Sequence, residues 1–351
     1  MDNVAHSLCG AALARAGLVR QGPLVTATLI VAANAPDVDA LLYIFGDSTD
    51  ALMHRRGWTH ALALFVLQIP LLAFLFHRLG RRHARRKGTE EPCWRSLLLA
   101  STLGYLSHLG LDLLNTYGVR FLLPFDDTWF RGDMAFIVDP WMWLMFGAAT
   151  LWGGGVRKAG YGLWAVLTAL GVLGMQSRSV PTPAIALWVG AMLLCGIGRA
   201  LKHANSTASR ALLVLVAFYL VGLKAASHAA RERGLRTVQQ ATSIVDLDST
   251  VNPAPAIPWR ANVVVATPET IHRVPINLFR DSSLDTITHS LQRNLSDPLL
   301  PSLEETREFR AWKRFARHPF VERHGSQIIL GDGRFSYGGP NGWASFVLPI
   351  P

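Results

Sequence analysis

Residues 211–227 read ALLVLVAFYLVGLKAAS, an apolar run with one charged side chain, Lys224. About 17–25 residues of this kind can cross the hydrocarbon core of a bilayer as a helix. Two shorter apolar stretches, 4–19 and 24–36, predict a helical hairpin that crosses only in part. Five further runs of spanning character lie between the hairpin and the last run, at 61–77, 97–114, 141–156, 161–176 and 183–198. The sequence therefore predicts a polytopic α-helical membrane domain with about six spanning helices.

The charge composition divides the chain near residue 228. Charged residues make up 17% of the 351 residues, against about 25% in ordinary soluble proteins. Residues 1–228 hold 20 Lys/Arg and 12 Asp/Glu, whereas the much shorter stretch 229–351 holds 14 and 12. We therefore predict a transmembrane domain over 1–228 and a small soluble domain over 229–351. This composition excludes a single soluble globule, a coiled coil and a disordered chain.

The C-terminal part carries the pattern of an α+β domain. NVVVAT (262–267) and TIHRVPINLF (270–279) are β-branched runs that predict a hairpin. Residues 303–324 begin acidic and end basic, which favours a helix because the helix dipole stabilises that order of charges. SQIILGDGRFSYGG (326–339) predicts a strand, a Gly-Asp-Gly turn and a second strand.

The basic residues predict how the chain lies in the membrane. Seven Lys/Arg between Arg78 and Arg95 follow the first long run, so that loop should be cytoplasmic. Alternation of the spans then puts 14 of the 20 basic residues of the first part inside and residues 229–351 outside. We expect a multi-pass protein of the bacterial inner membrane, in contact with membrane lipids, with a periplasmic C-terminal domain. No basic stripe with stacking aromatics occurs, so we expect no nucleic-acid partner.

Ionisable side chains inside or beside the apolar runs are the candidates for chemistry. Such residues are costly in a membrane and usually mark a function. Imidazole and carboxylate groups are also the ligands of hydrolytic metal sites. The three cysteines form no CxxC motif, so a thiolate site is not supported. The candidates are His6, Asp37 and Asp39 in NAPDVD, His54 and His60 in HRRGWTH, His108 and Asp112 in HLGLD, and Asp139 in DPW.

The spacing within each motif allows its members to converge. His108 and Asp112 are four residues apart, so on a helix they share a face. Asp37 and Asp39 follow Pro36, and both carboxylates can meet in the extended turn that the proline starts.

The HRRGWTH motif needs a turn. His54 and His60 are six residues apart and meet only if Gly57 permits a turn, with Thr59 capping the helix that begins at His60. The orientation derived from Lys/Arg alone places all the candidate groups at the outer membrane face. We therefore predict one metal site there. A lone His or Asp at any of these positions would be read as a cap or a hydrogen-bonded interface residue.

The four motifs together resemble a known family. NAPDVD, HRRGWTHA, HLGLDLLNTYG and DPW are similar to the bacterial inner-membrane metal-dependent hydrolases, a family whose best-known member is under LexA control. The resemblance extends to the tail, through NPAPAIPWRANVVV and ILGDGRF. It implies a hydrolytic chemistry but no particular substrate. It also implies a set of metal ligands, namely His6, Asp37, Asp39, His54, His60, His108 and Asp112.

The number of ligands predicts the mechanism. Four His and three Asp exceed what one tetrahedral zinc needs. We therefore expect a divalent metal, zinc above others, as one ion or as two ions about 3.5–4 Å apart that activate water against a phosphate or carboxylic ester. Asp39 or Asp112 would bridge two ions. Asp139 would accept a proton or orient a ligand imidazole.

Four arginines predict an anionic substrate, because guanidinium groups match phosphate. A site at the bilayer surface favours a lipid-linked or phospholipid-like ester. The arginines could instead neutralise the local acids Asp126, Asp127 and Asp133, and the sequence favours neither reading. The candidate substrate-binding arginines are Arg55, Arg56, Arg120 and Arg131.

Two non-hydrolytic functions remain as alternatives. The membrane domain could be a metal-stabilised scaffold that presents the periplasmic domain to a partner, in which case the ligand shell would be closed. A transporter would place ionisable groups through the depth of the membrane, and it commonly carries an inverted repeat. The sequence places the groups at one face and contains no repeat, which disfavours the transporter.

Overall fold

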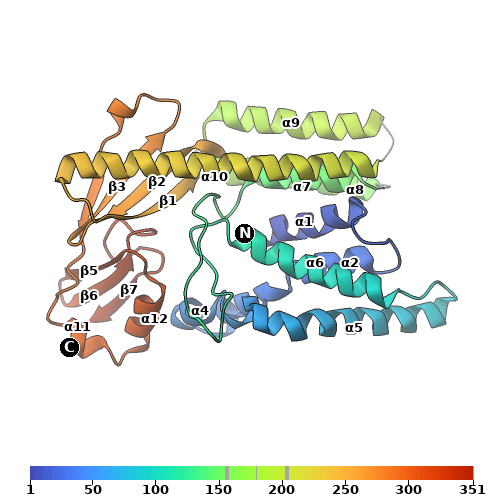
Figure 1. Ribbon diagram of the computed structural model, residues 1–351, viewed down its shortest axis with the longest axis horizontal. Coiled ribbons are helices and arrows are strands. Elements are labelled where there is room, and N and C mark those ends of the chain that lie inside the picture. The colour runs from blue at the N-terminus through green and yellow to red at the C-terminus, as the bar shows by residue number, and fades with distance from the viewer. Residues whose placement is uncertain (155–157, 179, 202–204, 351) are drawn as a thin grey trace. The chain divides into compact units, whose positions relative to one another are not determined.

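The computed structural model describes residues 1–154, 158–178, 180–201 and 205–350, and the chain forms two compact units (Figure 1). The end of the predicted 141–156 run lies outside the described residues. The first unit comprises Met1–Val38, Arg56–Leu223 and Pro255–Ile257. The second unit comprises Asp39–Arg55, Lys224–Ala254 and Pro258–Pro351. The long helix α10 (Ser206–Thr242) contributes to both units, so the domain boundary predicted at residue 228 falls inside a helix.

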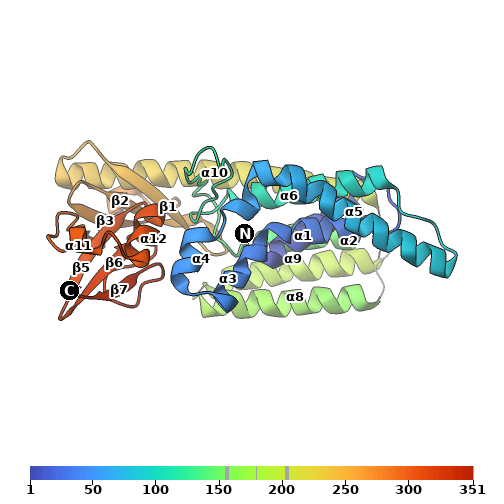
Figure 2. The same cartoon turned by 90° about the horizontal axis from the view of Figure 1, so that it is seen from below.

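Helices make up nearly all the regular structure of the first unit, which also contains one isolated β-bridge between Val119 and Phe130 among the described residues. Its helices α8 and α9 run side by side (Figure 2). The short 3₁₀ segment η1 begins in this unit and continues into the second. Besides the first part of α10, the elements are α1 (Asn3–Arg15), α2 (Val25–Ala32), η1 (Ala35–Leu41), η2 (Trp58–His60), α5 (Leu62–Lys87), α6 (Trp94–Asp112), α7 (Pro140–Trp152), α8 (Lys158–Ser177) and α9 (Thr182–Leu201).

Small residues let α1, α2 and α6 pack closely. A Cβ atom at Gly10 of α1 would lie 2.8 Å from the Leu29 carbonyl oxygen of α2. A Cβ atom at Gly104 of α6 would lie 2.4 Å from the Ala32 Cβ at the end of α2. Such close approach is typical of helix contacts in membranes, where small residues let backbones meet. The predicted hairpin of α1 and α2 is present, and α6 packs on it.

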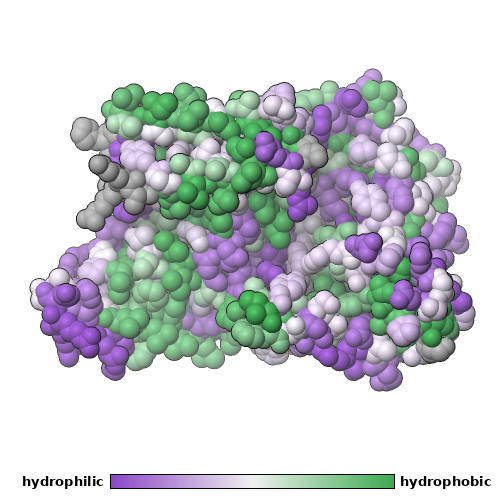
Figure 3. Space-filling model, turned by 180° about the vertical axis from the view of Figure 1, so that it is seen from behind, coloured by the Kyte–Doolittle hydropathy of each residue, from purple (hydrophilic) through white to green (hydrophobic). Residues whose placement is uncertain are grey.

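Three helices combine the length and apolar character of a membrane span in the described part of the chain: α5, α9 and α10. The bent pair of α2 and Ala35–Phe45 would make a fourth. Side chains such as Val66 (72% exposed) and Phe218 (71%) point outward, and wide hydrophobic areas appear on one face of the molecule (Figure 3).

Helices occupy all six of the predicted runs, but not all of them have spanning character. The helix α7 has 13 residues, a rise of about 20 Å, which is short of a bilayer core of about 30 Å. Its N-terminus is fixed by Pro140 at the first turn and by Asp139 as the N-cap. Within the described residues, the expectation of about six spans is therefore reduced to three or four.

The first sheet of the second unit packs on the end of α10. Its strand order is β1-β2-β3-β4. The predicted hairpin is confirmed, since β2 and β3 pair antiparallel with Val264 opposite Arg273. Val238 of α10 is buried with Val251 and Val263 in one apolar core. The strands are β1 (Asp248–Ala254), β2 (Ile257–Ala266), β3 (Thr270–Asn277) and β4 (His289–Gln292), and η3 (Ser282–Leu284) precedes β4.

The second sheet has the order β5-β6-β7 and packs beside α12 (Arg307–Phe315). The predicted helix over 303–324 is wrong beyond Phe315, because Pro319 starts a strand and cannot continue a helix. The predicted strand after Gly-Asp-Gly is also absent there, because the chain turns at Asp332 and the next strand is β7. The remaining elements are α11 (Leu300–Leu303), β5 (Pro319–His324), β6 (Gln327–Asp332) and β7 (Phe346–Pro349).

The segment Asp39–Arg55 belongs to the second unit although it lies early in the chain. It forms the short helices α3 (Leu42–Phe45) and α4 (Ser48–His54). The helix α4 packs on α12, and Arg307 of α12 forms ion pairs with Asp47 and Asp50.

Candidate metal centre

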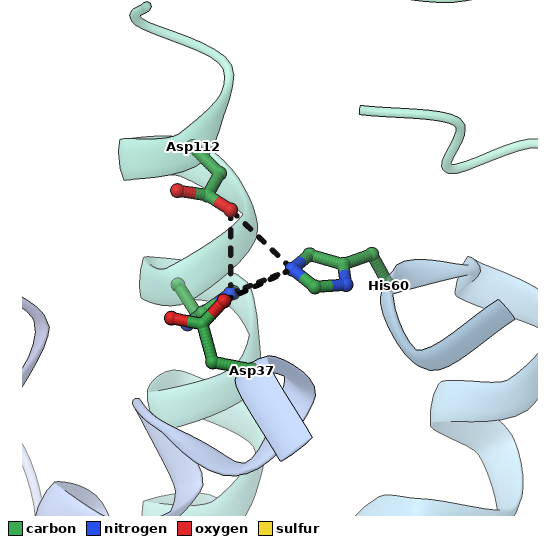
Figure 4. Close-up of side chains that lie close together, drawn as sticks. Asp37, His60 and Asp112 are labelled. Atoms are coloured by element: carbon green, nitrogen blue, oxygen red, sulfur yellow. Dashed lines mark hydrogen bonds and ion pairs between the residues drawn. The ribbon is translucent and has the colours of Figure 1, made fainter. Parts of the chain in front are cut away.

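Four buried side chains from three segments of the first unit meet at one point. Asp37 comes from η1, His60 from η2, and His108 and Asp112 from α6. One potential ligand atom from each of the four lies within 4.8 Å of all the others. Figure 4 shows Asp37, His60 and Asp112 pointing toward one another. The predicted convergence of these distant motifs is therefore present.

The ligand atoms lie at short mutual distances. His60 Nε2 and His108 Nε2 are 3.0 Å apart. Asp112 Oδ2 lies 3.3 Å from His60 Nε2 and 3.5 Å from His108 Nε2. Asp37 Oδ1 lies 3.8 Å from His60 Nε2. We call these four side chains the His/Asp cluster.

The backbone of α2 fixes the orientation of His108. His108 Nδ1 lies 2.8 Å from the carbonyl oxygen of Ala33. Because a carbonyl only accepts, Nδ1 must donate its proton, and in the neutral ring Nε2 keeps a lone pair that faces the cluster. Gly104, one turn before His108, allows α6 to approach α2 closely enough for this bond. A backbone carbonyl on the outer imidazole nitrogen is the usual support of a metal-binding histidine.

His60 lies in a short 3₁₀ turn that follows Gly57. Its Nδ1 is 2.9 Å from the Thr59 hydroxyl, which leaves Nε2 directed at the cluster. The expectation that Thr59 caps a helix beginning at His60 is wrong. The helix α5 begins at Leu62, and its N-cap residue, Ala61, makes no side-chain capping bond. Thr59 lies in η2 instead, where its hydroxyl contacts the imidazole of His60.

The two carboxylates are held by one oxygen each. Asn3 of α1 donates to Asp37 Oδ2 at 3.1 Å, which turns Oδ1 toward His60. Arg56 donates to Asp112 Oδ1 at 2.8 Å, and the amino group of Met1 also contacts that oxygen. Among the described residues, Asp112 Oδ2 accepts no hydrogen bond. The free lone pairs of this oxygen therefore face the two imidazoles.

His6 borders the cluster from α1. Its Nε2 lies 3.3 Å from Asp112 Oδ1, and its ring stacks on His108 at a centroid distance of 4.0 Å. It is fully buried. His6 lies outside the group of four whose ligand atoms converge, but it is close enough to Asp112 to extend that group.

Asp39 and His54 are not part of the cluster. Both belong to the second unit, and the His54 side chain is exposed in the last turn of α4. The motif spacing predicted that each would join its neighbour, but Asp39 follows Asp37 on a 3₁₀ helix rather than in an extended turn. Neighbours two apart on such a helix point in different directions.

Asp139 is a helix cap. It accepts bonds from the backbone N–H groups of Trp141 and Met142, and from the hydroxyl of Tyr219 on α10 at 2.8 Å. These contacts tie the start of α7 to α10. Asp139 is not among the residues that converge in the cluster.

Two of the four arginines lie in the HRRGWTH motif. Arg55 stacks over the ring of Tyr43 at 5.1 Å within the second unit. Arg56 is 1% exposed and holds Asp112, so its guanidinium faces a protein carboxylate rather than the solvent. The predicted role of Arg56 in binding substrate does not fit this burial.

The other two arginines lie in the loop after α6. Arg120 is buried, donates to Asp127 at 2.9 Å and stacks over Trp129. Arg131 stacks over the same ring at 5.5 Å. For Arg120 this favours the neutralisation of a local acid over substrate binding.

Asn3 and Asn115 contribute to the site without having been predicted from the sequence. Asn115 accepts bonds from Arg56 and from the Tyr117 backbone N–H. Both are amides in polar stretches next to the motifs. Their nearness to the ligand residues was the one available signal, because an amide has no charge to mark it as costly in a membrane.

The side chains of the cluster fit a divalent transition metal. Two imidazoles and two carboxylates are the donor set of zinc, iron or manganese sites. The lone pairs of His108 Nε2 and Asp112 Oδ2 face each other without a donor between them, and a cation would remove that repulsion. The burial of all four ligands makes an unfilled set costly.

Comparison with known proteins places the helical part in a family. The family model described as YdjM inner membrane protein matches residues 1–180. This confirms the resemblance to the LexA-regulated membrane hydrolases. The uncharacterized protein YfhP of Bacillus subtilis (strain 168) is 25% identical over 167 residues, which are 44% of this chain and 47% of the relative. The alignment thus spans about half the length of that curated relative. No solved structure matches the chain.

Proposed function

The chain belongs to the YdjM inner membrane protein family, and from this premise we propose that it is a membrane-embedded, metal-dependent hydrolase. The observation that carries the proposal is the buried His/Asp cluster, in which ligand atoms from three segments lie within 4.8 Å. Asp37, His60, His108 and Asp112 would hold the metal. His6 would take part in a second position if two ions bind.

A divalent metal at this cluster would lower the pKa of water to near neutrality and polarise an ester oxygen. The residues of the chain prepare the site for that chemistry. Ala33 and Thr59 fix the two imidazole rings, so that both Nε2 atoms point inward. Asn3 and Arg56 each occupy one carboxylate oxygen and leave the other to the cluster.

The substrate class follows from the surroundings. The exposed apolar faces of α5, α9 and α10 favour a protein surrounded by lipid, so the ester most accessible to the site is an amphiphile. We propose a lipid-linked or phosphate-bearing ester, with the C-terminal domain in the periplasm of the bacterial inner membrane. Zinc is the metal we would test first.

Metal analysis and hydrolysis assays on one preparation test the proposal. The full chain is purified in detergent, stripped with a chelator, and reloaded with zinc or manganese. Phosphodiester, phospholipid and carboxylic ester substrates are compared. We expect hydrolysis of one class only after reloading, and its loss in His108→Ala. The matched control is His83→Ala, an exposed histidine on α5.

Two results would contradict the proposal. Hydrolysis that survives both chelation and His108→Ala would remove the metal from the mechanism. Stoichiometric metal without hydrolysis of any ester class would instead favour the metal-stabilised scaffold that presents the C-terminal domain to a partner. The same metal analysis counts the ions, so a value of one or two equivalents decides between one centre and a pair.

A further inference from the structure

Arg56 is a fully buried arginine whose side chain ends at the His/Asp cluster. Its Nη2 donates to Asp112 Oδ1 at 2.8 Å, and its Nη1 donates to Asn115 Oδ1 at 3.0 Å. The guanidinium also stacks over the ring of Tyr117, 4.8 Å from its centroid. The guanidinium thus holds Asp112 of the cluster through Nη2 and Asn115 of the loop after α6 through Nη1.

The loop residue is itself fixed. Asn115 Oδ1 accepts a second bond, from the Tyr117 backbone N–H at 2.9 Å. The carbonyl of Arg56 accepts the Arg120 backbone N–H at 3.0 Å. The guanidinium is therefore held by the loop that follows α6, and not only by the carboxylate that it contacts.

The backbone of Arg56 adopts a conformation that arginine rarely takes. Its φ is +52°, in the left-handed region. A non-glycine residue there is strained and persists only where the surroundings enforce it, most often at functional sites. The turn that precedes η2 therefore directs Arg56 toward Asp112 at an energetic cost.

We propose that Arg56 is a positioning residue that holds Asp112 in the orientation that binds the metal. The proposal rests on the proposed metal centre. A carboxylate can present either oxygen, or both, to a metal. Because Arg56, together with the Met1 amino group, occupies Oδ1, the carboxylate offers Oδ2 to the imidazole side, where it lies 3.3 Å from His60 Nε2. The arginine thereby helps to fix which oxygen would bind the metal.

Arg120 supplies a matched control. It is as buried as Arg56, stacks on an aromatic ring in the same way, and belongs to the same unit. Its Nη1 donates to Asp127, which is not in the cluster. A substitution there removes a buried cation without touching a ligand.

The test is a cobalt titration of the metal-stripped full chain in detergent. The variants are Arg56→Met, Arg56→Lys, Asn115→Ala and the control Arg120→Met. Support of a metal ligand is typically worth about 10–100-fold in metal affinity. We expect a loss of that size in Arg56→Met and a smaller loss in Arg56→Lys, because lysine keeps the charge but not the fork. The cobalt affinity of Asn115→Ala should lie between that of Arg56→Lys and that of the unaltered protein.

The visible spectrum of bound cobalt separates positioning from general damage to the fold. In Arg56→Lys at saturating cobalt, we expect shifted absorption bands, because Asp112 is free to rotate or to chelate. Arg120→Met should keep both the affinity and the spectrum of the unaltered protein. If Arg56→Met fails to fold, Arg56→Lys and Asn115→Ala give the same information.

The outcomes are distinguishable. Unchanged affinity and spectrum in the Arg56 and Asn115 variants would overturn the positioning role, and so would an equal loss in Arg120→Met. Absence of cobalt binding in the unaltered protein would overturn the metal centre itself, and the role of Arg56 with it.

Discussion

The two units each bury a cluster of ionisable groups, and the clusters differ in how their charges are met. In the second unit, the buried Asp332 accepts bonds from the guanidinium of Arg334 and from the backbone N–H groups of Arg317 and His318. In the first unit, Asp112 has one oxygen bonded to Arg56, whereas the other faces two imidazoles and accepts no hydrogen bond from the described residues. Both oxygens of Asp332 thus have partners in the protein, whereas the His/Asp cluster has the geometry that could hold a cation.

The difference separates a structural ion cluster from a ligand set. A buried ion pair with all its lone pairs occupied supports the fold and leaves no position for a further ion. A buried carboxylate oxygen that faces imidazole nitrogens keeps its desolvation cost until a cation arrives. Both clusters combine Asp and His side chains with a neighbouring arginine, so composition alone does not distinguish them.

Removing the carboxylate of the satisfied cluster should have the largest effect. Asp332→Ala leaves the guanidinium of Arg334 buried without its counter-charge, which typically costs about 3–5 kcal/mol. The measurement is hydrogen exchange of β5 and β6 in the full chain, read by mass spectrometry. Bound metal per chain should not change. A variant that keeps its exchange protection, or that loses metal, would contradict the comparison.

Acid should weaken the second unit through His318. Burial, together with the cations Arg317 and Arg334, lowers the pKa of this imidazole to about 4, even though Asp332 and Asp248 favour its charged form. Between pH 6.5 and about 4 the unfolded chain binds a proton that the folded unit refuses. The contribution of neutral His318 to the free energy of unfolding is therefore fully present above pH 6.5. It is lost as the pH falls toward 4, by up to about 3 kcal/mol.

Hydrogen exchange of β5 as a function of pH checks this window. His318→Gln removes the titrating group and should flatten the profile. Asp332 contributes in a separate range, because the charge and bonds of Arg334 overcome the effect of burial and hold its pKa at about 2. An equally steep loss of protection between pH 6.5 and 4 in His318→Gln would refute the assignment to His318.

Metal should stabilise the first unit by a somewhat smaller amount. At a free metal concentration 100 times the dissociation constant, binding to the folded state alone contributes about 2.7 kcal/mol. We expect increased exchange protection of the last turns of α6 on loading with zinc, and no increase in Asp112→Asn. Asp332→Asn is the matched control and should keep the response. An equal increase in exchange protection in both units would contradict the prediction that metal binds the first unit alone.

Much of the fold follows from local pattern. The apolar runs predicted the positions of the helices, and β-branched runs predicted the β2–β3 hairpin. The errors lie where a local signal was overridden. Charge order favoured a helix over 303–324, but Pro319 and the pairing of β5 with β6 take the chain into a sheet. Spacing alone did not show that α7 would be too short to span.

Four of the seven predicted metal ligands converge in the structure, whereas the residues that hold them in place were not predicted. Asp37, His60, His108 and Asp112 stood out because charged or titratable groups are costly beside apolar runs. The contribution of the Ala33 carbonyl could not be predicted, since every residue carries one. The role of Arg56 depends on which way a buried side chain points. The sequence identifies Arg56 as a charged residue but does not show which group its side chain contacts.

The segment Asp39–Arg55 belongs to the second unit, but the residues on both sides of it belong to the first. It begins two residues after Asp37 and ends directly before Arg56, five residues before His60, and Arg307 of α12 forms ion pairs at the start of its helix α4. The C-terminal residues therefore contact a loop that begins just after η1, which carries Asp37, and ends just before η2, which carries His60. Truncation after residue 228 would release that loop, so the shortened chain would not be a neutral version of the membrane half.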